Sequence, residues 1–201
     1  MNKKKLSTRS MAGCAMLSAI AFVLMFLDFP LTFPFVLMPS FIKFDFSDLP
    51  ALIGAYVYGP AFGVLVELIK NLVHLLITKT AGIGELSNFI LGAVFAFCAG
   101  KIYAIKKTKK NAIIGGIIGS ILMGLISIPA NYFVVYPAYY TFMPKEAILS
   151  MYQVILPSVD SILECLTVFN FPFTAVKGLV CVAISVPLYK PLRKVLKHDG
   201  E

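Results

Sequence analysis

The sequence predicts an all-α polytopic membrane protein with six transmembrane helices and both termini in the cytoplasm. Of its 201 residues, 59% are hydrophobic and only 14% are charged, whereas soluble domains contain roughly 45–50% apolar and about 25% charged residues. Most of the Lys and Arg residues fall in three clusters, which we expect to be cytoplasmic because cytoplasmic loops carry an excess of these residues: 3–9, 101–110 and 190–197. The chain is therefore expected to be one membrane domain, 1–201, with basic tails at about 1–10 and 190–201.

Six apolar segments follow one another along the chain. The first, 11–27, is about 25 Å long as a helix, which is close to the minimum for a crossing. The second, 49–58, is shorter and ends at Gly59 and Pro60, so we expect it to turn back directly into the third. The remaining four segments are 63–78, 86–105, 112–135 and 172–188.

Prolines mark the fifth and sixth segments. Pro129 predicts a kink in the fifth, and Pro172 suits the first turn of the sixth, where a helix needs no backbone N–H. Residues 138–171, between these segments, are expected to stay outside. Their apolar residues recur at helical spacing from 147 to 156, which predicts one or two short helices over the mouth of the bundle.

Residues 30–48 are the first external loop in this topology. From 42 to 47 apolar and polar residues alternate, the two-residue period of an extended segment. The aromatic and charged members of this alternation are Lys43, Phe44, Asp45 and Phe46. The simplest interpretation is that the polar groups face water and that Asp48 or Ser47 caps the next helix. The alternative is that the aromatic and polar faces close together over an amphipathic ligand.

The third segment carries a polar stripe on an otherwise aliphatic helix. Its members recur at intervals of three and four residues: Glu67, Lys70, Asn71, His74 and Thr78. Because a charged group in lipid costs several kcal/mol, the stripe is expected to face the protein interior or a wet cavity. One alternative remains open here, namely that a Glu67–Lys70 or Lys70–His74 pair only orients the helices.

The sixth segment contains a lysine below its external end. Lys177 lies about 7–8 Å inside the helix if Pro172 opens it, on the same face as Thr174. A lysine at this depth meets either a ligand acceptor or a structural carboxylate, for which the candidates are Glu67, Asp160 and Glu164. Two amides are expected at comparable depth, Asn131 and Asn170. These features predict external loops that cap a ligand pocket.

Small residues form two further patterns. Ala12, Ala15 and Ala19 make a flat stripe on the first segment, of the kind that permits close helix approach and docking of a partner. Gly115 and Gly119 form a GxxxG pair, for which internal packing is the favoured interpretation.

The sequence offers little for catalysis or for a metal. It has no GxxxxGK[ST] motif for nucleotide binding, and its only histidines are His74 and His198, too few for a histidine-rich metal site. The four cysteines are scattered singly, which favours packing over metal or disulfide roles. A binding or transport protein is therefore favoured over the alternatives, a membrane-embedded enzyme or a structural scaffold.

Four stretches resemble a known family: "KFDFSDLPALIGA", "YGPAFGVLVELIKNLVH", "GELSNF" and the "PFxxxKG" opening of the last span. They are similar to the riboflavin-specific substrate-binding S component of energy-coupling factor (ECF) vitamin transporters. The resemblance implies a six-helix protein of the bacterial plasma membrane that captures vitamin from outside. It also implies two kinds of partner, a transmembrane coupling subunit that meets the alanine stripe and two cytoplasmic ATPases. Family members commonly have Asn where this chain has Thr174.

Riboflavin suits the polar and aromatic residues already described. Its flat ring system has carbonyls and an N–H along one edge, which aromatic walls, amides and an ammonium complement, and Lys43, Asp45 and Thr80 are expected to meet its polyhydroxyl tail. The full set of candidate ligand contacts is Lys43, Phe44, Asp45, Phe46, Asn71, Thr80, Asn131, Asn170, Thr174 and Lys177. No cofactor is expected apart from riboflavin as the transported ligand. Another vitamin is the alternative, although the cation of thiamine favours aromatic stacking and the chain has no Trp.

Overall fold

The computed structural model describes residues 8–30, 38–39, 42–78 and 80–197. Apart from a two-stranded antiparallel ribbon, its regular elements are helical, which confirms the predicted all-α class. In chain order they are α1 (Thr8–Met25), β1 (Phe29–Pro30), β2 (Lys43–Phe44), α2 (Asp48–Val57), α3 (Pro60–His74), the 3₁₀ turn η1 (Leu75–Ile77), α4 (Ile83–Ile105), α5 (Lys109–Ala130), the π-helical turn η2 (Asn131–Val135), α6 (Tyr136–Tyr139), α7 (Lys145–Gln153), α8 (Ile162–Cys165), the π-helical turn η3 (Leu166–Asn170) and α9 (Phe171–Lys197).

Five helical segments are long and apolar enough to cross a membrane, and α2 is a shorter apolar helix. The five are Thr8–Met25, Pro60–Ile77, Ile83–Ile105, Lys109–Tyr139 and Ile162–Leu188. The short second segment predicted from the sequence is α2, which lies inside the bundle against α1, α3, α4 and α9. Gly59 and Pro60 separate it from α3 as expected, because Gly59 adopts a φ of 117° that favours glycine and Pro60 begins α3.

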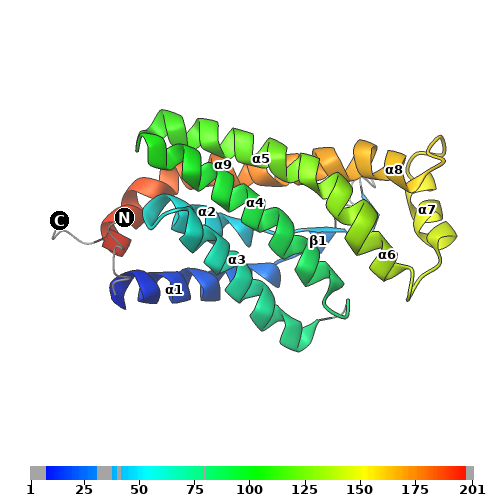
Figure 1. Cartoon of the computed structure of the whole chain (residues 1–201), viewed down its shortest axis with the longest axis horizontal. Coiled ribbons are helices and arrows are strands. Elements are labelled where there is room, and N and C mark those ends of the chain that lie inside the picture. The colour runs from blue at the N-terminus through cyan, green and yellow to red at the C-terminus, as the bar shows by residue number, and fades with distance from the viewer. Residues whose placement is uncertain (1–7, 31–37, 40–41, 79, 198–201) are drawn as a thin grey trace.

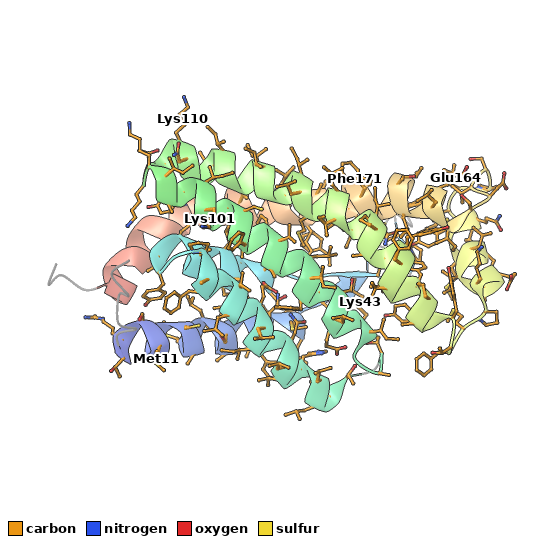
Figure 2. The ribbon with its side chains drawn as sticks, in the orientation of Figure 1. Met11, Lys43, Lys101, Lys110, Glu164 and Phe171 are labelled. Carbon is orange, nitrogen blue, oxygen red and sulfur yellow. The ribbon has the colours of Figure 1, made fainter. Side chains whose placement is uncertain are left out.

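The two ends of the bundle differ in character (Figure 1). At one end α1 begins, α4 turns into α5, and α9 finishes. At the other end lie the β-ribbon, α6, α7 and α8. Figure 2 shows Lys101 and Lys110 at the first end, whereas Lys43, Glu164 and Phe171 lie toward the second. The basic α4–α5 turn is therefore well separated from the predicted ligand-contacting loop.

Glycines allow α4, α5 and α9 to pack closely. A Cβ added at Gly115 would lie 2.8 Å from the carbonyl oxygen of Ala99, and one at Gly119 would lie 2.9 Å from that of Phe95. Both distances are shorter than normal carbon–oxygen contacts, so a side chain at either position would push α5 away from α4. The expectation that this GxxxG pair serves internal packing is confirmed.

The expected boundary of the last span is wrong. Ile162 begins a continuous helical segment that runs through η3 into α9, so Pro172 lies inside this segment and does not open it. The start is a capping box, in which Ser161 Oγ accepts from the Glu164 N–H and Glu164 Oε2 accepts from the Ser161 N–H. The π-helical turn before Pro172, where the Phe171 N–H donates to the Leu166 carbonyl, accommodates the missing proline N–H.

The rest of the predicted external region is confirmed in part. The helix α7 covers most of the stretch that the spacing indicated. However, the fifth span continues as helix to Tyr139, through a second π-helical turn, so residues 138–171 are not wholly outside the spanning segments. As at η3, a proline follows this turn closely, because Pro137 occupies the first turn of α6.

Candidate ligand site and its charge network

The strand β2 carries the extended segment that the alternation predicted. It pairs with β1 so that Phe44 lies opposite Phe29. Lys43 points outward, where it forms an ion pair with Asp28 at 2.9 Å. Asp45 points inward and is buried. Its Oδ1 accepts from the Ser47 N–H at 2.7 Å, and its Oδ2 accepts from Lys177 Nζ at 3.0 Å. The loop is thereby joined to α9.

Phe44 supplies an apolar contact at the same place. Its ring packs edge-on against Phe46, with centroids 5.3 Å apart, and against Phe173 of α9, with centroids 6.1 Å apart. Such edge-to-face pairs are favourable beyond the area they bury. The aromatic side of the loop therefore lies across the start of α9, one residue from Thr174.

The expectation that Asp48 or Ser47 caps α2 with its side chain is wrong. Ser47 occupies the N-cap position but makes no side-chain capping bond; its Oγ accepts from Lys70 Nζ at 2.7 Å. Asp48 is fully buried, with Oδ1 2.7 Å from Lys70 Nζ and Oδ2 3.0 Å from Lys177 Nζ. Two buried ammonium groups outcompete a backbone N–H, because charge-assisted hydrogen bonds are the stronger ones.

The polar stripe of α3 faces the interior, as predicted. Glu67 and Lys70 are fully buried and lie 2.8 Å apart, which confirms the Glu67–Lys70 pair. A Lys70–His74 pair is not formed; His74 Nδ1 lies 2.7 Å from Glu85 Oε1 instead. The stripe thus divides into two groups. One group, Glu67 and Lys70, belongs to a set that we call the charge network: Asp45, Asp48, Glu67, Lys70 and Lys177.

Lys177 has carboxylate partners other than the predicted ones. The sequence indicated Glu67, Asp160 or Glu164, but the structure places Asp45 and Asp48 beside its ammonium. The side chain is buried, so both contacts are shielded from water. An ammonium has three N–H donors; one of them donates to Asp45 Oδ2, and Asp48 Oδ2 lies beside the ammonium as an ion-pair partner at 3.0 Å. One donor is left for a further acceptor.

Asn170, Thr174 and Lys177 lie on one face of the last span, at intervals of four and three residues. All three are buried. The Asn170 Oδ1 accepts from the hydroxyl of Tyr152 at 2.7 Å, and the Asn170 side chain is also hydrogen-bonded to the hydroxyl of Tyr136. No side-chain hydrogen bond of Thr174 is formed within the described part of the chain. This face therefore offers an amide N–H, a hydroxyl and an ammonium.

Asn131 is buried at the start of the π-helical turn η2. Its Nδ2 donates to the Ser127 carbonyl at 2.7 Å, which leaves its Oδ1 as the group it presents. A Cβ at Gly124 of α5 would lie 3.0 Å from Phe171, so the end of α5 packs closely against the start of α9. The expectation that Asn131 and Asn170 lie at comparable depth stays a prediction.

The other candidates lie outside the network. Asn71 is buried and donates to the Glu67 carbonyl at 2.8 Å. Thr80 belongs to a second polar group, in which its hydroxyl donates to Glu85 Oε2 at 3.0 Å. Glu85 was missed as a site residue by the sequence interpretation, although it directly follows the "KTAGIG" stretch that contains Thr80. Tyr152 was also missed, because nothing in its local sequence indicates a contact with Asn170.

Comparison with known proteins identifies the family. The family model for the ECF transporter substrate-specific component matches residues 9–189. The chain belongs to this family. The riboflavin transporter RibU of Staphylococcus aureus is 37% identical over 184 residues, covering 92% of this chain and 90% of the relative. The riboflavin transporter FmnP of Bacillus subtilis is 32% identical over 198 residues, covering 96% and 97%.

A solved structure shares the fold. It is described as the S component of a bacterial ECF transporter, is 33% identical, and superposes with a TM-score of 0.71 over 94% of this chain and 98% of the other. The predicted family is confirmed, and the chain is an integral membrane protein as expected. These relatives are named as transporters or as a transporter component, which supports the prediction that the chain is not an enzyme.

Proposed function

We propose that this ECF S component binds riboflavin and delivers it for uptake. The observation that carries the proposal is the buried face of Asn170, Thr174 and Lys177, which adjoins the aromatic loop at Phe44. The relatives named as riboflavin transporters match nearly the whole chain, which supports the same ligand.

The chemistry of this face suits the ring of a flavin. The remaining N–H of Lys177 and the amide N–H of Asn170 are donors for ring carbonyls or ring nitrogens, and the Thr174 hydroxyl can donate or accept. The Thr174 hydroxyl can therefore make one of the hydrogen bonds that the Asn common at this position in the family can make. Phe44 and Phe46 supply an apolar wall for the ring.

We assign the remaining candidates to the outer part of the site. Lys43 and Thr80 are partly exposed polar groups, suited to the hydroxyl tail. Asp45 is an acceptor for a tail hydroxyl, and it also holds the ammonium of Lys177. The Oδ1 of Asn131 is an acceptor for a ligand N–H or O–H. Asn71 is assigned the same acceptor role through its Oδ1, which is buried without a hydrogen-bond partner within the described residues.

The proposed topology has six crossings with both termini in the cytoplasm. The α4–α5 turn, with its exposed lysines, then lies inside, and the β-ribbon and α7 cap the ligand from outside. A transmembrane coupling subunit docks on α1, where Ala12, Ala15 and Ala19 are exposed and form a flat surface. Two cytoplasmic ATPases bound to that subunit supply the energy.

Uptake by cells that cannot make riboflavin tests this function. The cells express this chain with or without the coupling subunit and ATPases, and uptake of labelled riboflavin is measured against other vitamins. Riboflavin uptake that needs all the subunits, and that excess thiamine or biotin does not inhibit, is expected. Uptake of a different vitamin, with no riboflavin transported, would refute the ligand while leaving the family unchanged.

A further inference from the structure

Four lysines gather where α4 turns into α5. Only residues 106–108 separate the two helices. We call the four lysines in and beside this turn the basic patch: Lys106, Lys107, Lys109 and Lys110. All four are exposed, and Figure 2 shows Lys110 projecting from this end of the bundle. The short turn therefore concentrates four ammonium groups on one small surface.

No carboxylate neutralises the basic patch within the described residues. The acidic residues that the structure describes lie near the β-ribbon, in the interior, at the start of α4 or around α7 and α8: Asp28, Asp45, Asp48, Glu67, Glu85, Glu146, Asp160 and Glu164. The ion pairs in the described part of the chain involve none of the four lysines. Lys101 of α4 differs, because its ammonium lies over the Phe97 ring, 5.5 Å from the centroid. The charges of the patch thus remain available to an anion from outside the chain.

The basic patch lies at the level of lipid headgroups. The helices α4 and α5 belong to the apolar segments 83–105 and 109–139, so the turn lies where both segments leave the hydrocarbon. Ile105, directly before the patch, is 81% exposed, and an apolar side chain in this position is favourable against acyl chains. The surface therefore combines cations with an apolar neighbour. This combination matches a phospholipid, which has a charged head and apolar tails, better than a small dissolved anion.

The basic patch is also separate from the surface proposed for the coupling subunit. Figure 1 shows α1 along one margin of the bundle and α5 along the opposite margin. Met11 and Lys110 mark these two margins at the same end of the bundle (Figure 2). A coupling subunit docked on the alanine stripe of α1 therefore leaves the patch in contact with the membrane.

We infer that the basic patch binds the headgroups of anionic phospholipids in the cytoplasmic leaflet. The inference rests on the proposed topology, in which this turn is cytoplasmic, but not on the proposed ligand. Clusters of about four to eight Lys and Arg at the cytoplasmic end of a transmembrane helix attract anionic lipids. The lipid phosphate accepts charge-assisted hydrogen bonds from the ammonium groups. A zwitterionic lipid binds less well, because its own cation cancels the charge of its phosphate.

Titration of the purified full chain in neutral detergent tests the inference. Fluorescent phosphatidylglycerol is the anionic probe, fluorescent phosphatidylcholine is the zwitterionic one, and anisotropy reports binding. We expect tighter binding of phosphatidylglycerol. Lys107→Gln alone should weaken it by about fivefold, the effect of one lysine near a lipid surface. Replacing all four lysines of the patch with Gln should reduce the preference for phosphatidylglycerol by more than about twentyfold.

Two controls separate charge from other effects of substitution. Replacing the same four lysines with Arg keeps the charges and should preserve the preference for the anionic lipid. Lys145→Gln removes an exposed lysine at the start of α7, away from the patch, and should leave the preference unchanged. Thermal unfolding shows whether each variant is folded; if the fourfold Gln variant is not, the comparison of Lys107→Gln with Lys145→Gln decides.

Several results would overturn the inference. Equal affinity for the two lipids, or an unchanged preference in the folded Gln variants, would show that the patch selects no anionic lipid. Glycerol phosphate has the headgroup chemistry without the tails, so its displacement of the probe at the concentration at which the lipid binds would indicate a site for a dissolved anion. An unchanged lipid preference together with lost assembly with the coupling subunit would make the patch a protein-docking surface.

Riboflavin titration keeps this inference apart from the proposed function. The patch lies at the opposite end of the bundle from the β-ribbon, so the fourfold Gln variant should bind riboflavin as the wild type does. Failure of the folded wild type to bind riboflavin would overturn the proposed ligand and leave the lipid site intact. Loss of the lipid preference with normal riboflavin binding is the result that supports both.

Discussion

Replacing Lys70 with Met tests whether the charge network holds α2 and α3 together. Lys70 is fully buried, and its ammonium lies 2.7 Å from Ser47 Oγ, 2.7 Å from Asp48 Oδ1 and 2.8 Å from Glu67 Oε2. Met fills most of the same volume but carries no charge. Asp48 keeps Lys177 as a partner, whereas Glu67 is left with no ion-pair partner within the described residues.

The expected loss is large because a carboxylate remains buried without its cation. Breaking a buried ion pair from one side costs roughly 3–5 kcal/mol. A chain of this size loses about 2–4 °C of melting temperature per kcal/mol, so Lys70→Met should unfold roughly 6–20 °C earlier. Adding Glu67→Gln removes the stranded charge and should recover more than half of the loss.

Thermal unfolding in detergent measures these effects, with Lys145→Met as the control. Lys145 is exposed at the start of α7 and forms no ion pair within the described residues, so its substitution should leave the melting temperature unchanged. Two results would refute the reasoning: a Lys70→Met variant as stable as the wild type, or a double variant less stable than Lys70→Met.

Three further predictions concern the ligand, the partner surface and the helix packing. Lys177→Met should weaken riboflavin binding by about ten- to a hundredfold, the range for a hydrogen bond to a charged group, and should lower the melting temperature because the buried Asp45 loses its cation, whereas Asp48 keeps Lys70; unchanged affinity in a titration would refute a ligand contact. Ala15→Leu combined with Ala19→Leu should abolish uptake but leave riboflavin binding intact, because both side chains are exposed on α1; equal loss of both activities would argue against docking there. Gly119→Val should lower the melting temperature, because its Cβ would lie 2.9 Å from the Phe95 carbonyl oxygen; a wild-type melting curve would contradict that close packing.

The sequence predicts the helices of this protein well because lipid constrains them simply. Apolar segments and basic clusters report where a chain crosses and on which side it turns. The inward direction of the polar stripe of α3 was equally predictable, because a charged side chain that faces lipid is costly. This direction and the Glu67–Lys70 pair follow from spacing within one helix.

The partners of the lysines were not predictable in the same way. Lys177 meets Asp45 from a loop 132 residues earlier, and Lys70 meets Asp48 across 22 residues. Periodicity tells which face of a helix a side chain occupies, but not which other element packs on that face. The alternation around Asp45 therefore indicated an extended segment with a polar side, without identifying the cation that this side meets.

The start of the last span was missed although a local signal was present. Ser161 and Glu164 have the spacing of a capping box before an apolar run. Pro172 predicts a later start, because proline favours a first helical turn. The structure keeps the helix continuous by widening the turn just before the proline, and a π-helical turn of this kind has no simple sequence signature.

The central claim is that this chain alone forms a riboflavin site, since every proposed contact comes from its own residues. Titration of the purified, folded chain in detergent with riboflavin, followed by quenching of flavin fluorescence, tests it most directly. We expect saturable quenching with one vitamin bound per chain and no competition from excess thiamine or biotin. Absence of quenching at micromolar riboflavin, from a protein with a cooperative melting transition, would contradict the claim.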